Sequence, residues 1–433
     1  MRTWTLAIAL ALSLGGCSSD FPAPRSELPT APAANDPAFA IQGLRSWYLL
    51  GDGATPGQDQ VTIIVQAPAG TKFVDAYLAD LPPQRMIDQA DGFALQTSIA
   101  NVPAGDHAIL FSADGQREAF AKVTFHRSAA YYVLVSTDYD FSDPGTYAIG
   151  YMDWLHRDHA GMRITHFWAP YTYTDPVVTQ ARRAELDTWI HKQRDTFHDE
   201  IGLHIHPYCT FVEDAGMTCI TDQSTVYPTD TSGYTIKVSA YGRDNFGILL
   251  HHAFELFAQH DLGKPQTFRA GGWTADLNTL LALSDNNFIS DTSALNWARI
   301  EEWKGKELYD WNMSHWAPID DTSQPYRPSQ TDPLTSAPGA DMAMLEVPDN
   351  GVMIDYVTLA EMTGIFDANW DGTPLAAPRT LMMGFHPAPG FSQAEYKRVD
   401  DFLTYADLHV ASRDLGPVVY ITLSDVTPAF PAQ

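Results

Sequence analysis

Basic residues and cysteine are both scarce in this chain. Its 433 residues include 26 Lys and Arg against 53 Asp and Glu, a formal net charge of −27. Such a charge repels polyanions, so nucleic acid and anionic membrane surfaces are poor partners and a strongly anionic polymer is disfavoured as a substrate. High acidity is also a common solubility trait. No internal repeat is found.

The first residues form a targeting segment. Arg2 precedes an apolar run over residues 6–14 that is too short to span a bilayer. The following residues 14–17 resemble a bacterial lipobox, which predicts that residues 1–16 are a signal peptide and that Cys17 is lipidated. Ser18, rather than Asp, favours the outer membrane, on its periplasmic or surface face. The alternative is an ordinary secretory signal with a chance cysteine.

The chain has three cysteines, and lipidation of Cys17 would leave Cys209 and Cys219. A pair of cysteines in an exported protein predicts a disulfide, worth roughly 2–3 kcal/mol for so short a loop. Alternatively, Cys209, three residues after His206, ligates a metal.

Composition divides the rest of the chain into three parts. Residues 17–40 are rich in Pro and Ala and are expected to form a tether. Residues 41–127 contain short strand-like runs separated by turn signals, which predicts a small all-β sandwich that either binds carbohydrate or acts as a spacer. Residues 128–433 alternate strands and helices, which predicts an α/β domain with a parallel sheet or distorted (β/α) barrel. Residues 300–378 break this alternation and are interpreted as an insertion of unknown role.

Polar residues with metal-binding chemistry follow two of the predicted strands. Asp138 and Asp140 come directly after the apolar run 131–135, and His204 and His206 lie at the end of another strand. Residues two apart on an extended segment point to the same side, so both imidazoles can bind one ion. Asp140, His204 and His206 are therefore the predicted metal ligands, a set that suits zinc, with cobalt or nickel as alternatives.

Taken in order, five segments resemble the motifs of the metal-dependent polysaccharide deacetylases, carbohydrate esterase family four. The resemblance spans about residues 130–425, and the segments lie at residues 138–140, 204–206, 268–273, 290–297 and 384–387. It implies a metal-dependent carbohydrate deacetylase, with a divalent ion as cofactor and an acetylated glycan as substrate.

The resemblance also implies roles for single residues. Asp138 would be the general base and Arg269 its charge partner, while His386 would be the general acid, supported by Asp291. Four aromatic residues are candidates for contacting sugar rings: Trp273, Trp297, Trp168 and Tyr171.

The chain departs from the family pattern at two places. The family's second motif has its histidines four residues apart, whereas here position 208 is Tyr, so His206 is preferred as the second ligand although another residue could serve. The third motif has Ala270 and Gly271 where the family has prolines and a tyrosine, which marks a divergent member.

Two other histidine groups are weaker metal candidates. His251 and Glu255 are four residues apart on a predicted helix that is otherwise apolar, and His156 and His159 lie in a polar segment. We interpret the first group as an ordinary helix face and do not favour His156 and His159 as ligands.

The sequence thus predicts a lipid-anchored exported hydrolase that removes acetyl groups from a polysaccharide, with no nucleic-acid partner and no membrane contact beyond the anchor. The alternative is a non-catalytic glycan-binding or envelope-assembly lipoprotein on a degenerate deacetylase scaffold. A third possibility is a metal-dependent amidase that acts on a non-sugar amide.

Overall fold

The computed structural model describes residues 21–36, 39–78, 81–143, 145–224, 231–388 and 390–432, and it divides into two compact units. The first unit contains residues up to 44 with 60–99 and 107–124, and the second contains 45–59, 100–106 and 125–433. The predicted signal peptide 1–16, Cys17 and Ser18 lie outside the described residues. Among the described helices, none is both long and apolar enough to cross a membrane.

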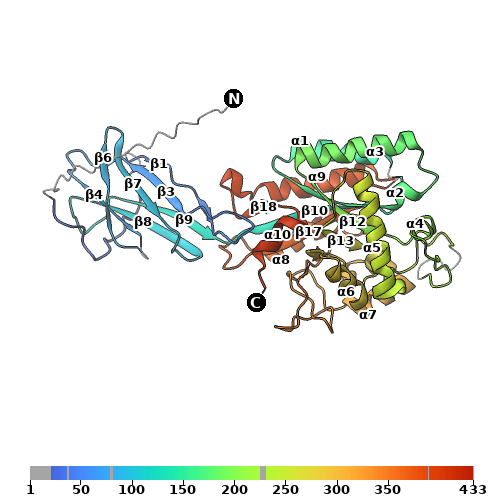
Figure 1. Ribbon diagram of the computed structural model, residues 1–433. Coiled ribbons are helices and arrows are strands. Elements are labelled where there is room, and N and C mark those ends of the chain that lie inside the picture. Colours follow the sequence, from blue (N-terminus) through green and yellow to red (C-terminus); the bar gives the residue numbers. More distant parts are fainter. Residues whose placement is uncertain are drawn as a thin grey trace, which may run out of the picture. The chain divides into compact units, whose positions relative to one another are not determined.

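The first unit is built from antiparallel strands in two sheets (Figure 1). Residues of β3 alternate between buried and exposed, as expected for strands with one face on a core. One sheet has the order β1 (Ile41–Gln42), β3 (Gln60–Val65), β7 (Gly92–Ser98) and β6 (Ile87–Gln89). The other contains β9 (Ala121–Ser128), β8 (Gly105–Ala113), β4 (Val74–Leu78) and β5 (Gln84–Arg85), and β2 (Trp47–Leu49) pairs with the last residues of β9, which belong to the second unit. The predicted all-β module is confirmed.

A curled parallel sheet, open like half a barrel, organises the second unit and confirms the predicted α/β class. The strand order is β15-β14-β13-β12-β11-β10-β17-β16, with β18 also paired to β10. The strands are β10 (Tyr131–Asp138), β11 (Ile164–Trp168), β12 (Glu200–Ile205), β13 (Thr267–Ala270), β14 (Ser290–Asp291), β15 (Leu345–Glu346), β16 (Val352–Met353), β17 (Arg379–Phe385) and β18 (Val418–Tyr420).

Helices surround this sheet (Figure 1). Their bounds are α1 (Thr146–Asp158), α2 (Tyr171–Thr174), α3 (Gln180–Lys192), α4 (Cys209–Asp214), α5 (Gly242–Gln259), α6 (Leu277–Asp285), α7 (Glu307–Trp316), α8 (Leu359–Asn369), α9 (Gln393–Asp407) and α10 (Leu423–Val426). Helix α10 packs on the face of β10 opposite to α1, α8 and α9. Both α8 and α9 begin with a capping box, Thr358 with Glu361 and Ser392 with Glu395, which satisfies backbone N–H groups at their first turns. Helix α3 begins at Gln180, after the N-cap Thr179, and continues into a π-helical turn, η1 (Gln193–Phe197).

The central strand β10 is buried along its whole length. Val133 and Val135 pack with residues of α1, α8 and α9, whereas Tyr132 and Leu134 pack on the other face with Leu423 of α10. A parallel strand covered on both faces is a near-continuous apolar run, which explains why 131–135 was readable from the sequence. Asp138 ends β10 opposite Phe167 of β11, and Thr137 lies opposite Phe385 of β17, so the carboxyl ends of these strands meet at one edge.

The segment 300–378, interpreted from the sequence as an insertion, belongs to the sheet. It contributes α7, α8, β15 and β16, and β16 forms the edge next to β17. Each of the two strands has only two residues, which is too short to produce a visible hydrophobic period.

Candidate metal-dependent active site

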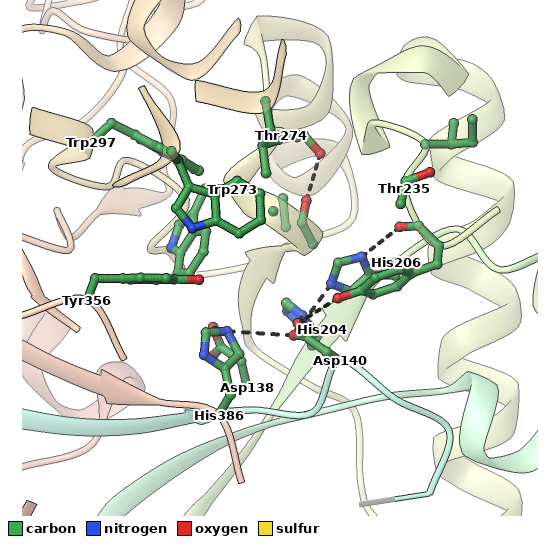
Figure 2. A pocket seen from close by; sticks show the side chains of 17 residues that line it. Asp138, Asp140, His204, His206, Thr235, Trp273, Thr274, Trp297, Tyr356 and His386 are labelled. Carbon is green, nitrogen blue, oxygen red and sulfur yellow. Dashed lines mark hydrogen bonds and ion pairs between the residues drawn. The ribbon is translucent and has the colours of Figure 1, made fainter. Parts of the chain in front are cut away.

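The carboxyl edge of the sheet holds a cavity of about 190 Å³. Asp138 ends β10 and Asp140 follows it, His204 belongs to β12 and His206 follows that strand, and His386 directly follows β17. All five side chains line the cavity, as Figure 2 shows. The structure therefore brings together residues that are up to about 250 positions apart in the sequence, because parallel strands end at a common edge.

Asp140, His204 and His206 form a metal-binding constellation. Asp140 Oδ1 lies 3.1 Å from His204 Nε2 and 3.5 Å from His206 Nε2, and the three ligand atoms lie within 4.8 Å of one another. Within the described residues, no other group of three or more His, Cys, Asp or Glu has its ligand atoms so close. The set supplies one carboxylate and two imidazoles, which are common zinc ligands.

Hydrogen bonds fix the orientation of both imidazoles. The Nδ1–H of His204 donates to the backbone oxygen of Arg269 at 2.9 Å, and that of His206 donates to the backbone oxygen of Tyr234 at 2.9 Å. A neutral imidazole has one N–H, so each ring presents the lone pair of Nε2 to Asp140. In the described structure His206 Nε2 is buried without a hydrogen-bond partner. Lone pairs that face a carboxylate need a cation between them, and these residues therefore fit a metal ion.

Asp140 is ionised at this place. Burial raises the pKa of the Asp140 carboxyl, but the positive charge of His386 and the contacts with His206 and His204 outweigh burial and hold that pKa well below its usual range. The Tyr234 hydroxyl also donates to Asp140 Oδ2 at 3.1 Å. Sequence reasoning missed Tyr234, since nothing in the pattern of residues 231–236 relates this loop to β12.

Asp138 is paired with Arg269 through one carboxylate oxygen, and its other oxygen accepts no hydrogen bond from the described residues. Arg269 Nη1 lies 2.7 Å from Asp138 Oδ1 and donates to Ser136 Oγ at 3.0 Å, while Arg269 Nη2 lies 3.3 Å from Asp349 Oδ2. The Arg269 guanidinium is fully buried and comes from β13. Asp138 Oδ2 is buried and has no hydrogen-bond partner among the described residues, so it can accept a proton inside the cavity.

His386 is paired with Asp355, and the expected pairing with Asp291 is wrong. His386 Nδ1 lies 2.7 Å from Asp355 Oδ2, and Nε2 lies 3.8 Å from both Asp138 Oδ2 and Asp140 Oδ1. Burial lowers the pKa of His386, but the carboxylates of Asp140, Asp355 and Asp138 outweigh burial and raise it to about 10. The imidazole is therefore cationic at neutral pH, with Nε2–H directed toward the cavity.

Asp291 has a different environment because of the strand order. It ends β14, which β13, β12, β11 and β10 separate from β17. Its carboxylate accepts from Ser293 Oγ at 2.9 Å and hydrogen-bonds with Glu346. The sequence signal for Asp355 was the run Val352–Met353 and Ile354 directly before it, a strand end hidden within the supposed insertion.

Two of the four predicted aromatic contacts line the cavity. Trp273 and Trp297 are on its wall, together with Trp303, Tyr356 and Leu308, which sequence reasoning did not select. The predictions for Trp168 and Tyr171 are wrong, because both are fully buried in the core formed with α3 and α5. Trp168 donates to the Tyr173 hydroxyl, and the Tyr171 hydroxyl donates to the backbone oxygens of Tyr139 and Asp140, which supports the turn that carries Asp140.

The weaker metal candidates have ordinary partners. Cys209 is joined to Cys219 by a disulfide, so its thiolate is not a ligand. His156 lies 2.8 Å from Asp199, His159 lies 3.1 Å from both Asp400 and Asp407, and exposed His251 packs at its ring edge against Phe254.

Comparisons with known proteins give structural resemblance only. No family model and no curated protein match the chain. Among solved structures, the Puue allantoinase has 11% identity over 69% of this chain and 90% of its own, with a TM-score of 0.42. A probable polysaccharide deacetylase from Pseudomonas aeruginosa PAO1 has 11% identity over 69% and 90%, with a TM-score of 0.41. The family 4 carbohydrate esterase from Streptomyces lividans, in complex with acetate, has 10% identity over 65% and 91%, with a TM-score of 0.32.

Proposed function

We propose that this protein is a metal-dependent hydrolase that removes acetyl groups from a polysaccharide or oligosaccharide. The observation that supports the proposal is that three chemically different groups face one cavity. They are the ligand set Asp140, His204 and His206, the oxygen of Asp138 that has no hydrogen-bond partner among the described residues, and His386, whose Nδ1 is paired with Asp355. A binding protein needs no buried base and acid beside its metal ligands, so the arrangement favours the enzyme over the non-catalytic alternative.

Zinc is the ion that we favour, because two imidazoles and one carboxylate are a usual ligand set with positions left for water and substrate. Cobalt and nickel accept the same donors. A divalent ion bound there would supply Lewis acidity and would lower the pKa of water to about 7.

The chain's own residues account for the proton transfers. Asp138 removes a proton from the attacking water through Oδ2, while Arg269 holds Oδ1 and fixes the direction of the carboxylate. The water oxygen forms a bond to the acyl carbon, and the bond from that carbon to the sugar oxygen or nitrogen breaks. His386 delivers the proton from Nε2 to this leaving atom, since Nδ1 is occupied by Asp355. The products are acetate and a free hydroxyl or amine.

The test is acetate release from acetylated chitin and xylan oligosaccharides by protein that has been stripped with a chelator and reloaded with Zn²⁺. Asp138→Asn is expected to retain one equivalent of metal and lose activity by about 10²–10⁴-fold, the usual contribution of a general base. Asp143→Asn is the control, because the partly exposed Asp143 pairs with Arg182 and is not among the residues that line the cavity. Metal retention without acetate release from any glycan would favour the binding-protein alternative, and failure to bind metal would overturn the proposal.

We also propose that the protein acts outside the cytoplasm as a lipoprotein of the outer membrane. Support comes from the lipobox-like residues 14–17 and from the Cys209–Cys219 disulfide, because disulfides persist in oxidising compartments. Metabolic labelling with a fatty-acid analogue tests this directly. Wild-type protein should be labelled and Cys17→Ser should not, whereas an unlabelled wild type would indicate an ordinary secretory signal.

A further inference from the structure

Two indole N–H groups at the cavity wall have no hydrogen-bond partner. Trp273 and Trp297 are 4% and 2% exposed, and in the described structure neither Nε1 atom has an acceptor. Two other buried tryptophans do have one: Trp316 donates to the backbone oxygen of Trp273, and Trp370 donates to that of Thr373. Trp189 Nε1 is also unpartnered, but Trp189 does not line the cavity. A buried donor without an acceptor costs free energy unless a ligand satisfies it.

The backbone of Trp273 is held in an unfavourable conformation that directs this side chain. The φ angle of Trp273 is 55°, in the left-handed region that bulky residues avoid, and the preceding residue, Gly272, has a φ angle of 59°. Helix α7 fixes this turn, since Asn312 donates to the Gly272 oxygen at 3.0 Å and Trp316 to the Trp273 oxygen at 3.2 Å. Strained residues persist where the surrounding structure enforces them, most often at functional sites.

Trp273 presents the edge of its ring to the reaction centre. Its ring and that of His386 are 5.9 Å apart at 87°, and Figure 2 shows the indole nitrogen on the side that faces Tyr356 and His386. The expectation from the sequence was a flat surface for stacking against a sugar. An edge-on indole close to the proposed acid is instead placed to donate a hydrogen bond.

We propose that Trp273 is a specificity-determining residue whose indole N–H donates to a neutral oxygen of the substrate, next to the acyl-bearing carbon, with Trp297 as a second donor. This inference rests on the proposed hydrolase function and names the substrate class more closely: an acyl sugar with a hydroxyl, ring or glycosidic oxygen beside the scissile group. An anionic acceptor is disfavoured, because the carboxylates of Asp138 and Asp140 line the same cavity.

Kinetics on two substrates test the inference. Zinc-loaded wild type and Trp273→Phe, which keeps an aromatic ring without the N–H, are compared on the best of the acetylated saccharide probes and on 4-nitrophenyl acetate, which has no sugar oxygen. We expect kcat/KM for the saccharide to fall about tenfold, mainly through KM, and kcat/KM for 4-nitrophenyl acetate to change less than twofold. Trp168→Phe is the control, because Trp168 is buried away from the cavity and any effect should be equal on both substrates.

Equal losses on both substrates, or no loss on either, would overturn the role of Trp273 and leave the hydrolase proposal intact. Absence of acetate release by the wild type from every saccharide would overturn both. A binding measurement gives a readout without turnover: in ¹⁵N-Trp-labelled Asp138→Asn protein, the indole signal that Trp273→Phe removes should move downfield when saccharide is added. An unmoved signal at saturating saccharide would contradict the proposal, even if Trp273→Phe itself proved unstable.

Discussion

His386 and Asp355 are paired through Nδ1 and Oδ2 at 2.7 Å, although 31 residues separate them in the sequence. The strand register explains the pairing. Met353 of β16 lies opposite Gly384 of β17, so Asp355 and His386 are each two residues beyond a matched pair at the carboxyl edge. Asp355 therefore reaches the general-acid candidate from an edge strand that the sequence did not reveal.

Replacing Asp355 tests this pairing. In Asp355→Asn we expect kcat to fall by about 10²-fold or more, because an amide no longer stabilises the cationic imidazole and Nε2–H is no longer fixed as the donor. Metal content should stay near one equivalent, since Asp355 is not a ligand. Asp371→Asn is the control, because the Asp371 carboxylate is exposed and accepts a hydrogen bond from Thr373. If Asp355→Asn had the same kcat as the wild type, the role of His386 as general acid would not depend on its pairing with Asp355.

A second prediction concerns the space beside His206. A Cβ at Gly271 would lie 2.6 Å from His206 Cγ and 2.7 Å from Nδ1, closer than real Cβ contacts. Gly271→Ala should displace the His206 ring and weaken zinc affinity by at least about tenfold, as loss of ligand orientation does. Gly364→Ala on α8 is the matched control, because nothing lies within 4 Å of its Cβ. Competition with a chelating dye measures the zinc affinity of both variants. An affinity of Gly271→Ala equal to that of Gly364→Ala would mean that His206 is not a ligand.

Tyr234 is expected to support the metal site without binding the ion. Its hydroxyl donates to Asp140 and its backbone oxygen accepts from His206, so Tyr234→Phe removes only the first contact. We expect a loss of zinc affinity of about tenfold, with the fold unchanged. Tyr241→Phe removes a hydroxyl that accepts from the Ile220 N–H and serves as the control. Calorimetric zinc titration distinguishes them, and unchanged affinity in Tyr234→Phe would show that this hydrogen bond does not position Asp140.

Most of the site was predictable because long buried strands are recognisable in the sequence as apolar runs. The runs that became β10, β12 and β17 are apolar, and polar residues directly after such runs meet at one edge of a parallel sheet. Asp140, His206 and His386 follow this rule.

The errors have physical causes of two kinds. Chain order does not give strand order: Asp291 ends β14, four strands from β10, and only the fold shows that it cannot reach His386. The second cause is the direction of the side chain. Trp168 is the last residue of β11, as expected for a residue of the site, but its side chain points into the helix-covered core. Asp355 was missed because a strand of two residues has no period.

The buried carboxyl group of Glu346 leads to a prediction about stability and pH. Burial and the neighbouring charge of Asp291 raise the pKa of Glu346 well above its usual range, and burial raises the pKa of Asp291 and of Asp349 to about 6. A carboxyl with a raised folded-state pKa stabilises the fold below its unfolded pKa of about 4, and this contribution is lost as the pH rises through the folded value. The free energy of unfolding should therefore fall from about pH 4 through pH 6 and above.

Glu346→Gln isolates this effect, because a glutamine is neutral at every pH and cannot incur the cost of ionisation. Relative to wild type, the variant should have nearly the same stability at pH 5, where protonated Glu346 and the glutamine amide can each donate to Asp291, and it should be more stable at pH 8, where only Glu346 is exposed to the cost of ionisation. Urea unfolding of chelator-treated protein at the two pH values measures the difference, which excludes any effect of metal binding. Glu213→Gln, at an exposed residue of α4, should show no such gain at pH 8. A stability difference for Glu346→Gln that is independent of pH would mean that Glu346 is already ionised in the folded protein at pH 5.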